Sequence, residues 1–133
     1  MIDIFSPADN RVFSLIDLVR TNPILYLGKK SITLFSAQMA GYIWACEDHK
    51  TADISFLPLD IFQAWVYIKY KNKMMISFDK ILLMACNNDE ERALDAFFSD
   101  WDEFLAQDHE MLKHDYLDEH GHVIRFPNKY WYD

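Results

Sequence analysis

Glycine and proline are scarce in this sequence, with three glycines and four prolines in 133 residues. Sheet-rich folds with many tight turns use both residues more often, so we expect a mainly helical fold. No apolar run approaches the roughly 20 residues that cross a bilayer. The first ten residues lack the basic start and long apolar core of a signal peptide. We therefore expect a cytoplasmic protein.

Cysteine is also rare, with one residue at position 46 and one at position 86. Both lie in apolar segments with helical periodicity, which predicts buried free thiols in a reducing compartment rather than a disulfide. Burial raises the pKa of a thiol and makes it unreactive, so neither cysteine is a good candidate for a nucleophile.

Hydrophobic residues make up 51% of the chain, which is enough for a real core and argues against disorder. A chain of this length fits one compact domain, residues 1–133. We expect about five helices, with a short extended or hairpin-like tail after them. The predicted helices cover residues 7–20, 31–49, 59–71, 78–85 and 89 to about 110.

The basic residues are too few to balance the acidic ones, and the net charge is −8. Residues 1–88 carry nine basic and eight acidic side chains, whereas residues 89–133 carry four basic and thirteen acidic ones. This imbalance disfavours direct binding to nucleic acid or to an anionic membrane. It leaves two interpretations open, namely a basic protein partner and ordinary solubility.

The segment 22–46 joins a predicted turn to an apolar helix. Pro23 and Gly28 bound a short apolar run that we expect to form a core turn. Ser31 is a good N-cap for the helix that follows. Gly41 costs that helix roughly 1 kcal/mol relative to alanine, so we expect another helix to approach closely there. Trp44 is predicted to lie in the core.

The predicted fifth helix has the clearest amphipathic pattern. Its apolar stripe includes Leu94, Phe98, Trp101 and Leu105, and acidic residues occupy the opposite face. Like charges at this spacing repel one another, and a basic partner would relieve that repulsion. The predicted partner-binding residues are on this face, in the loop after it and in the aromatic tail: Glu91, Asp95, Asp102, Glu103, Asp118, Glu119, Tyr130 and Trp131.

A cluster of histidines and carboxylates near the C-terminus has the donor types that suit zinc or manganese. Its spacing matches no established ligand pattern, so we predict no metal, no cofactor and no catalytic residue. A small metal-dependent enzyme is the least favoured alternative. The cluster consists of His114, Asp115, Asp118, Glu119, His120 and His122.

Two segments, 15–46 and 59–105, resemble a family of small bacterial immunity proteins from polymorphic-toxin and contact-dependent growth inhibition systems. Asn22 departs from the arginine that often precedes the proline in such sequences. The matching features are the P-x-x-YLG turn (Pro23, Tyr26, Leu27, Gly28), the pair Gly41 and Tyr42, the helix with Phe62, Trp65, Lys69 and Tyr70, and the stretch SFDKILLMACNNDEERALDAFF.

The resemblance implies a cytosolic, helical protein without enzymatic activity that neutralises one cognate toxin by binding it. Many antibacterial toxins are nucleases with basic clefts, so the acidic C-terminal third is consistent with a basic toxin as partner. A helical adaptor or regulatory module that binds an unrelated partner is the alternative hypothesis.

Overall fold

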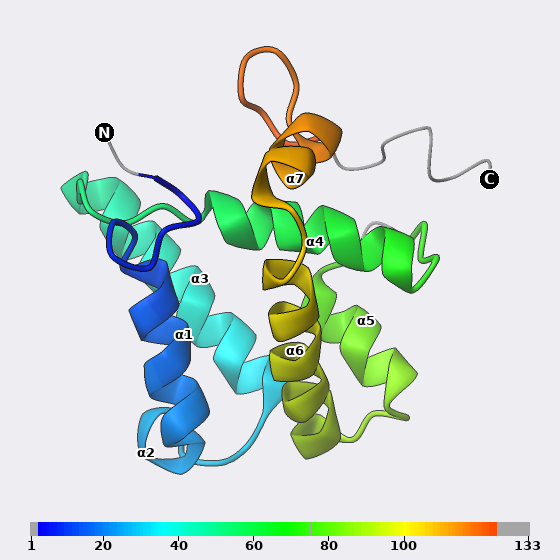
Figure 1. Cartoon of the computed structure of the whole chain (residues 1–133). Coiled ribbons are helices and arrows are strands. Elements are labelled where there is room, and N and C mark those ends of the chain that lie inside the picture. Colours follow the sequence, from blue (N-terminus) through cyan, green and yellow to red (C-terminus); the bar gives the residue numbers. More distant parts are fainter. Residues whose placement is uncertain (1–2, 75, 125–133) are drawn as a thin grey trace.

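The computed structural model describes residues 3–74 and 76–124 of the chain. Over these ranges the chain is mainly helical and contains no strand (Figure 1). The helical fold class is therefore confirmed, although the helices number seven instead of about five. They are α1 (Val12–Thr21), α2 (Pro23–Leu27), α3 (Ile32–His49), α4 (Leu57–Lys69), α5 (Phe78–Ala85), α6 (Glu90–Leu105) and α7 (His109–Tyr116).

Helix α6 lies in the middle of the molecule and packs against α3, α4 and α5 (Figure 1). Its inner face is the centre of an aromatic core. The ring of Phe62, which is fully buried on α4, lies 5.4 Å from the rings of both Trp101 and Phe104. Phe13 of α1 reaches the same tryptophan, with 6.0 Å between the ring centroids. The predicted apolar stripe of this helix is thus confirmed.

Helix α1 begins later than the sequence predicts, at Val12 instead of Pro7. The cause is Asn10, whose fully buried side chain binds other backbone groups. Its amide nitrogen donates to the carbonyls of Ile4 (2.9 Å) and Ser55 (3.0 Å), and its oxygen accepts from the amides of Val12 (3.1 Å) and Ser55 (3.0 Å). An asparagine so engaged competes with helix formation, and residues 6–10 form turns instead.

The segment that we expected to be a core turn is a short helix, α2, in which only Leu27 packs partly buried against the core and the other large apolar side chains are exposed. Asn22 caps it by accepting a hydrogen bond from the amide of Leu25. Gly28 ends it with φ = 84°, which confirms the predicted left-handed glycine. However, none of the residues of α2 is buried, and Ile24 and Leu25 are 64% and 68% exposed. The prediction of a core turn is therefore wrong.

Helix α3 starts as predicted, because the Ser31 hydroxyl accepts a hydrogen bond from the amide of Leu34 (3.1 Å). Its C-terminal half differs from the prediction. Trp44 is 78% exposed instead of buried. Apart from its chain neighbours and the nearby backbone of α3 itself, a Cβ placed on Gly41 would have no atom of the described chain within 4 Å. The helix expected to approach this glycine is thus not found in the described part of the chain.

The described residues do not support the predicted extended or hairpin-like tail as a whole, because its first residues, 114–116, belong to a helix. The long fifth helix divides into α6 and α7, because Asp108 caps a new helix by accepting from the amides of Glu110 and Met111. After α7 one antiparallel bridge joins Leu117 to Val123 around a turn. Gly121 adopts φ = 79° in that turn, as a turn glycine should. Tyr130 and Trp131 lie outside the described residues.

Both cysteines are free, with Cys86 buried and Cys46 half-buried. None of the helices over residues 3–74 and 76–124 combines the length and the apolar character needed to span a bilayer.

Candidate partner-binding surface

The outer face of α6 carries the predicted acidic residues, but other elements supply cations to them. Lys30, in the loop before α3, lies between Glu91 (3.3 Å) and Asp95 (3.2 Å). Both carboxylates are about three-fifths exposed, so these ion pairs contribute little stability. The hydrogen bonds to Asp95 and Glu91 raise the pKa of the Lys30 ammonium.

Two turns further along, Asp102 forms a bidentate ion pair with Arg20 of α1. The two N–O distances are 2.7 and 2.5 Å. The guanidinium also lies 5.4 Å from the centroid of the Phe98 ring, so its position is fixed on two sides. The hydrogen bonds from Arg20 outweigh partial burial and lower the pKa of the Asp102 carboxyl.

The C-terminal end of α6 binds α4 through Lys69. This lysine donates to the buried Asp100 (2.6 Å) and pairs with the exposed Glu103. Tyr70 donates its hydroxyl to the other oxygen of Asp100 at 2.6 Å. Burial opposes the charge on Lys69, but the two carboxylates outweigh it and raise the pKa of its ammonium. Burial and the Asp100 bond raise the pKa of the Tyr70 hydroxyl.

These contacts correct the interpretation of the acidic face as a row of like charges that awaits a basic partner. Each predicted acidic residue on α6 already has a cation from α1, α4 or the loop before α3. We call this set the ion-pair seam; it comprises Glu91, Asp95, Asp100, Asp102 and Glu103 with Arg20, Lys30 and Lys69. Sequence reasoning missed the three cations because they lie more than 30 residues away along the chain.

With its three cations counted, the ion-pair seam has a net charge of −2, and a larger excess of negative charge lies after α6. Residues 106–124 contain five acidic side chains and one lysine, Lys113. Asp118 shapes the turn there, because it accepts hydrogen bonds from the amides of His120 (2.8 Å) and His122 (2.9 Å). The His122 bond is the main reason why the pKa of the Asp118 carboxyl is lowered. The Glu119 side chain is 86% exposed and available to a partner.

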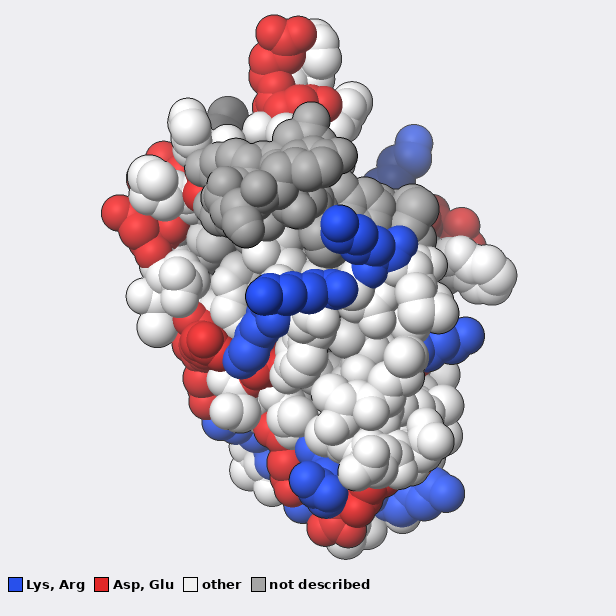
Figure 2. Space-filling model, turned by 90° about the vertical axis from the view of Figure 1, so that its right-hand side faces the viewer, with Lys and Arg blue, Asp and Glu red and all other residues white. Residues whose placement is uncertain are grey.

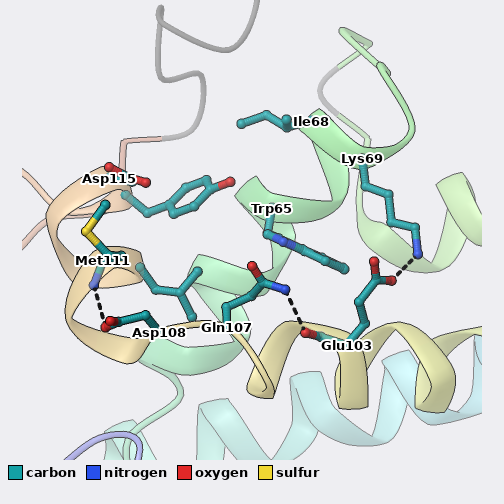
Figure 3. Close-up of a pocket in the computed structure, with 10 residues that line it drawn as sticks. Trp65, Ile68, Lys69, Glu103, Gln107, Asp108, Met111 and Asp115 are labelled. Carbon is teal, nitrogen blue, oxygen red and sulfur yellow. Dashed lines mark hydrogen bonds and ion pairs between the residues drawn. The ribbon is translucent and has the colours of Figure 1, made fainter.

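A groove of about 520 Å³ lies between α4 and α7, beside this acidic segment (Figure 3). In Figure 3 Trp65 of α4 lies between Met111 on one side and the pair of Lys69 and Glu103 on the other. The floor is mainly apolar, and three of the five polar lining residues are acidic. The apolar lining residues are Trp65, Ile68, Met111, Leu112 and Tyr116, and the polar ones are Lys69, Glu103, Gln107, Asp108 and Asp115, the last with a side chain that is only 9% exposed.

On one side of the molecule, the acidic residues are unevenly distributed. Figure 2 shows the side formed by α5 and the end of α4. Acidic side chains gather along the left edge of this view, while a broad uncharged area occupies the lower right.

The histidines near the C-terminus do not assemble a metal site in the described part of the chain. His120 lies 3.4 Å from Glu119, and His122 lies 3.8 Å from Asp118. Across residues 3–74 and 76–124, no three histidine, cysteine or carboxylate side chains converge as metal ligands.

Comparison with protein-family models, with curated proteins and with solved structures gave no match. Function must therefore be inferred from the surface of the molecule itself.

Proposed function

We propose that this protein is an immunity protein that binds a cognate antibacterial toxin and neutralises it by occupying a basic surface. The groove between α4 and α7 is the observation that carries the proposal, because it combines an apolar floor with an acidic border. The sequence resemblance to immunity proteins is consistent with it. In this proposal the protein acts by binding alone, without catalysis or a cofactor.

The groove suits one kind of partner segment. An apolar or aromatic side chain would enter between Trp65 and Met111, which is 53% exposed and adaptable in shape. A lysine or arginine residue beside that anchor would meet the exposed Asp108 at the border. Apolar anchors supply most of the binding energy in such interfaces, and charged borders supply orientation and speed.

The ion-pair seam has a supporting role in this proposal. At each end of the seam one lysine is shared by two carboxylates: Lys30 by Glu91 and Asp95, and Lys69 by Asp100 and Glu103. Each end therefore keeps a net negative charge, and the seam adds to the field of the acidic segment. Such a field increases the association rate with a basic toxin by roughly 10 to 10³-fold at low salt.

A growth assay tests the proposal. The C-terminal domain of a secreted toxin encoded beside this gene is expressed in a susceptible bacterium, with and without this protein. We expect full protection by the wild type. Loss of protection is expected for Met111→Arg combined with Glu119→Lys, which closes the groove and reverses an exposed charge.

Met84→Arg is the matched control, since Met84 of α5 is also 53% exposed and lies outside the groove. It should protect like the wild type. Equal protection by the groove variant would disprove the groove as the site. Tight binding of the toxin domain without protection would contradict neutralisation, and it would indicate a helical adaptor instead.

A further inference from the structure

The outer face of α3 is uncharged and exposed. No charged residue occurs between Lys30 and Glu47. With 3.6 residues per turn, Leu34, Gly41 and Trp44 lie on one side of the helix, opposite the buried Phe35 and Met39. A helix that is apolar on all sides is normally buried on all sides. Here one side faces the solvent.

Helix α2 extends this apolar surface. The Gln38 side chain donates to the carbonyl of Tyr26 (3.3 Å), which places the end of α2 beside the middle of α3. We call the combined surface the α2–α3 face. Its large side chains and their exposed fractions are Trp44 78%, Leu25 68%, Ile24 64%, Tyr26 39% and Leu34 38%.

The area of the α2–α3 face is large for a monomer. At roughly 200 Å² per fully exposed large side chain, these fractions amount to roughly 600 Å² of apolar surface. The largest apolar patch of an ordinary monomer is about 300–600 Å². Two such surfaces together give roughly 1,200 Å², which is the lower bound of a standard specific interface.

Gly41 indicates how the face is covered. It weakens α3 by roughly 1 kcal/mol relative to alanine, and nothing in the described chain comes near it. Ala37 and Ala45 lie one turn before and one turn after it, and both are exposed. Small residues at this spacing let a second helix approach closely. A helix from outside the described part of the chain would account for the cost of the glycine.

We infer that the α2–α3 face binds a second copy of this chain in a twofold-symmetric dimer, with the two α3 helices crossing at Gly41. The charge distribution selects this occupant. Two copies that each carry a net charge of −8 repel each other, and an uncharged face keeps that repulsion smallest. A twofold axis also makes the same patch complementary to itself.

Sedimentation equilibrium of the full chain, from 1 to 200 μM, tests the inference. We expect a monomer–dimer equilibrium in that range. Because the interface is uncharged while the copies repel each other, the dimer should become tighter as salt increases. The site for a basic toxin should show the opposite salt dependence. A monomer at 200 μM and high salt would overturn the inference and leave the proposed function untouched.

Two variants locate the interface. Gly41→Leu places a side chain at the crossing, and Trp44→Asp puts a charge in its centre; each should weaken the dimer at least tenfold. Both sites are open in the monomer, so circular dichroism should show an unchanged helix content. Met84→Asp is the control for added charge on another exposed apolar site, and it should dimerise normally. A dimer unaffected by both α3 variants would overturn the assignment.

Discussion

The helices α6 and α3 are the longest in the described structure, with 16 and 18 residues, and they differ in how they meet the solvent. The outer face of α6 is charged and tied to its neighbours by the ion-pair seam. The outer face of α3 is apolar and exposed around Gly41 and Trp44. A hydrophobic pattern identifies the buried face only when the opposite face is polar, and α3 lacks that contrast.

The two tryptophans of these helices give the largest expected effect. Trp101 is 2% exposed and packs among four aromatic rings, so Trp101→Ala should destabilise the fold by about 3–5 kcal/mol. Trp44→Ala should cost less than about 0.5 kcal/mol, as an exposed residue does. Urea denaturation at low protein concentration measures both. Similar losses of unfolding free energy for the two variants would contradict the proposed difference between the buried face of α6 and the exposed face of α3.

The acidic residues of α6 should differ among themselves. Asp100→Ala should cost about 2–3 kcal/mol, because it leaves Lys69 and the Tyr70 hydroxyl without their buried acceptor. Asp95→Ala is the control and should cost less than about 0.5 kcal/mol, since its pairing with Lys30 is exposed. Thermal unfolding followed by circular dichroism would compare them. A larger loss of stability for Asp95→Ala than for Asp100→Ala would mean that the exposed pairing with Lys30 contributes more to the fold than the buried contacts of Asp100.

Gly28, which precedes α3, and Gly41, in the middle of α3, should respond to substitution in opposite directions. Gly28→Val places a β-branched residue at φ = 84° and should cost about 1–2 kcal/mol, with partner affinity unchanged once the variant is folded. Gly41→Ala should stabilise the dilute monomer by up to about 1 kcal/mol, because the added methyl group meets nothing. Chemical denaturation at 1 μM separates them. A destabilised Gly41→Ala monomer would show that the outer face of α3 is already covered within the chain.

The smallest effect concerns Glu90, which joins the two helices. Its carboxylate accepts hydrogen bonds from the Ser31 hydroxyl (2.7 Å), the Thr33 amide (2.9 Å) and the Thr33 hydroxyl (2.7 Å). Burial opposes its charge, but these bonds outweigh burial and hold the pKa below the ordinary 4.5. A lowered pKa in the folded state means that the stabilisation is complete above that value and is lost as the pH falls through the folded pKa.

Glu90→Gln should therefore cost about 1 kcal/mol at neutral pH, and the difference from the wild type should shrink below about pH 4.5. Glu91→Gln, one residue along, is the control, and it should cost less than about 0.5 kcal/mol at neutral pH because its pairing with Lys30 is exposed. Urea titrations between pH 3 and pH 7 measure this. A gap that stayed constant down to pH 3 would mean that the Glu90 charge has no part in joining α3 to α6.

Local chemistry made much of the fold predictable. The stripe of α6, the Ser31 cap and the left-handed Gly28 each depend on a few neighbouring residues, and all three were correct. The N-cap at Asp108 is also a local feature of the sequence, and it predicts the boundary between α6 and α7. The position of α2 and the exposed face of α3 depend on which apolar surface finds a partner, which no local pattern determines.

The candidate site was less predictable than the fold. The acidic residues were visible in the sequence, but their cations Arg20, Lys30 and Lys69 come from distant segments. The groove between α4 and α7 likewise needs residues that are about 45 positions apart, such as Trp65 and Met111. Sequence reasoning therefore found the charge and missed the cavity beside it.

The buried side chain of Asn10 has a consequence for the dynamics of the N-terminal region. Its oxygen accepts from the amides of Val12 and Ser55, which are 43 positions apart. Neither amide can exchange its hydrogen with solvent until its hydrogen bond to Asn10 breaks. A local opening that displaces the Asn10 side chain breaks both bonds at once. The first turn of α1 and the connector before α4 should therefore exchange as a single unit, although they are distant in the chain.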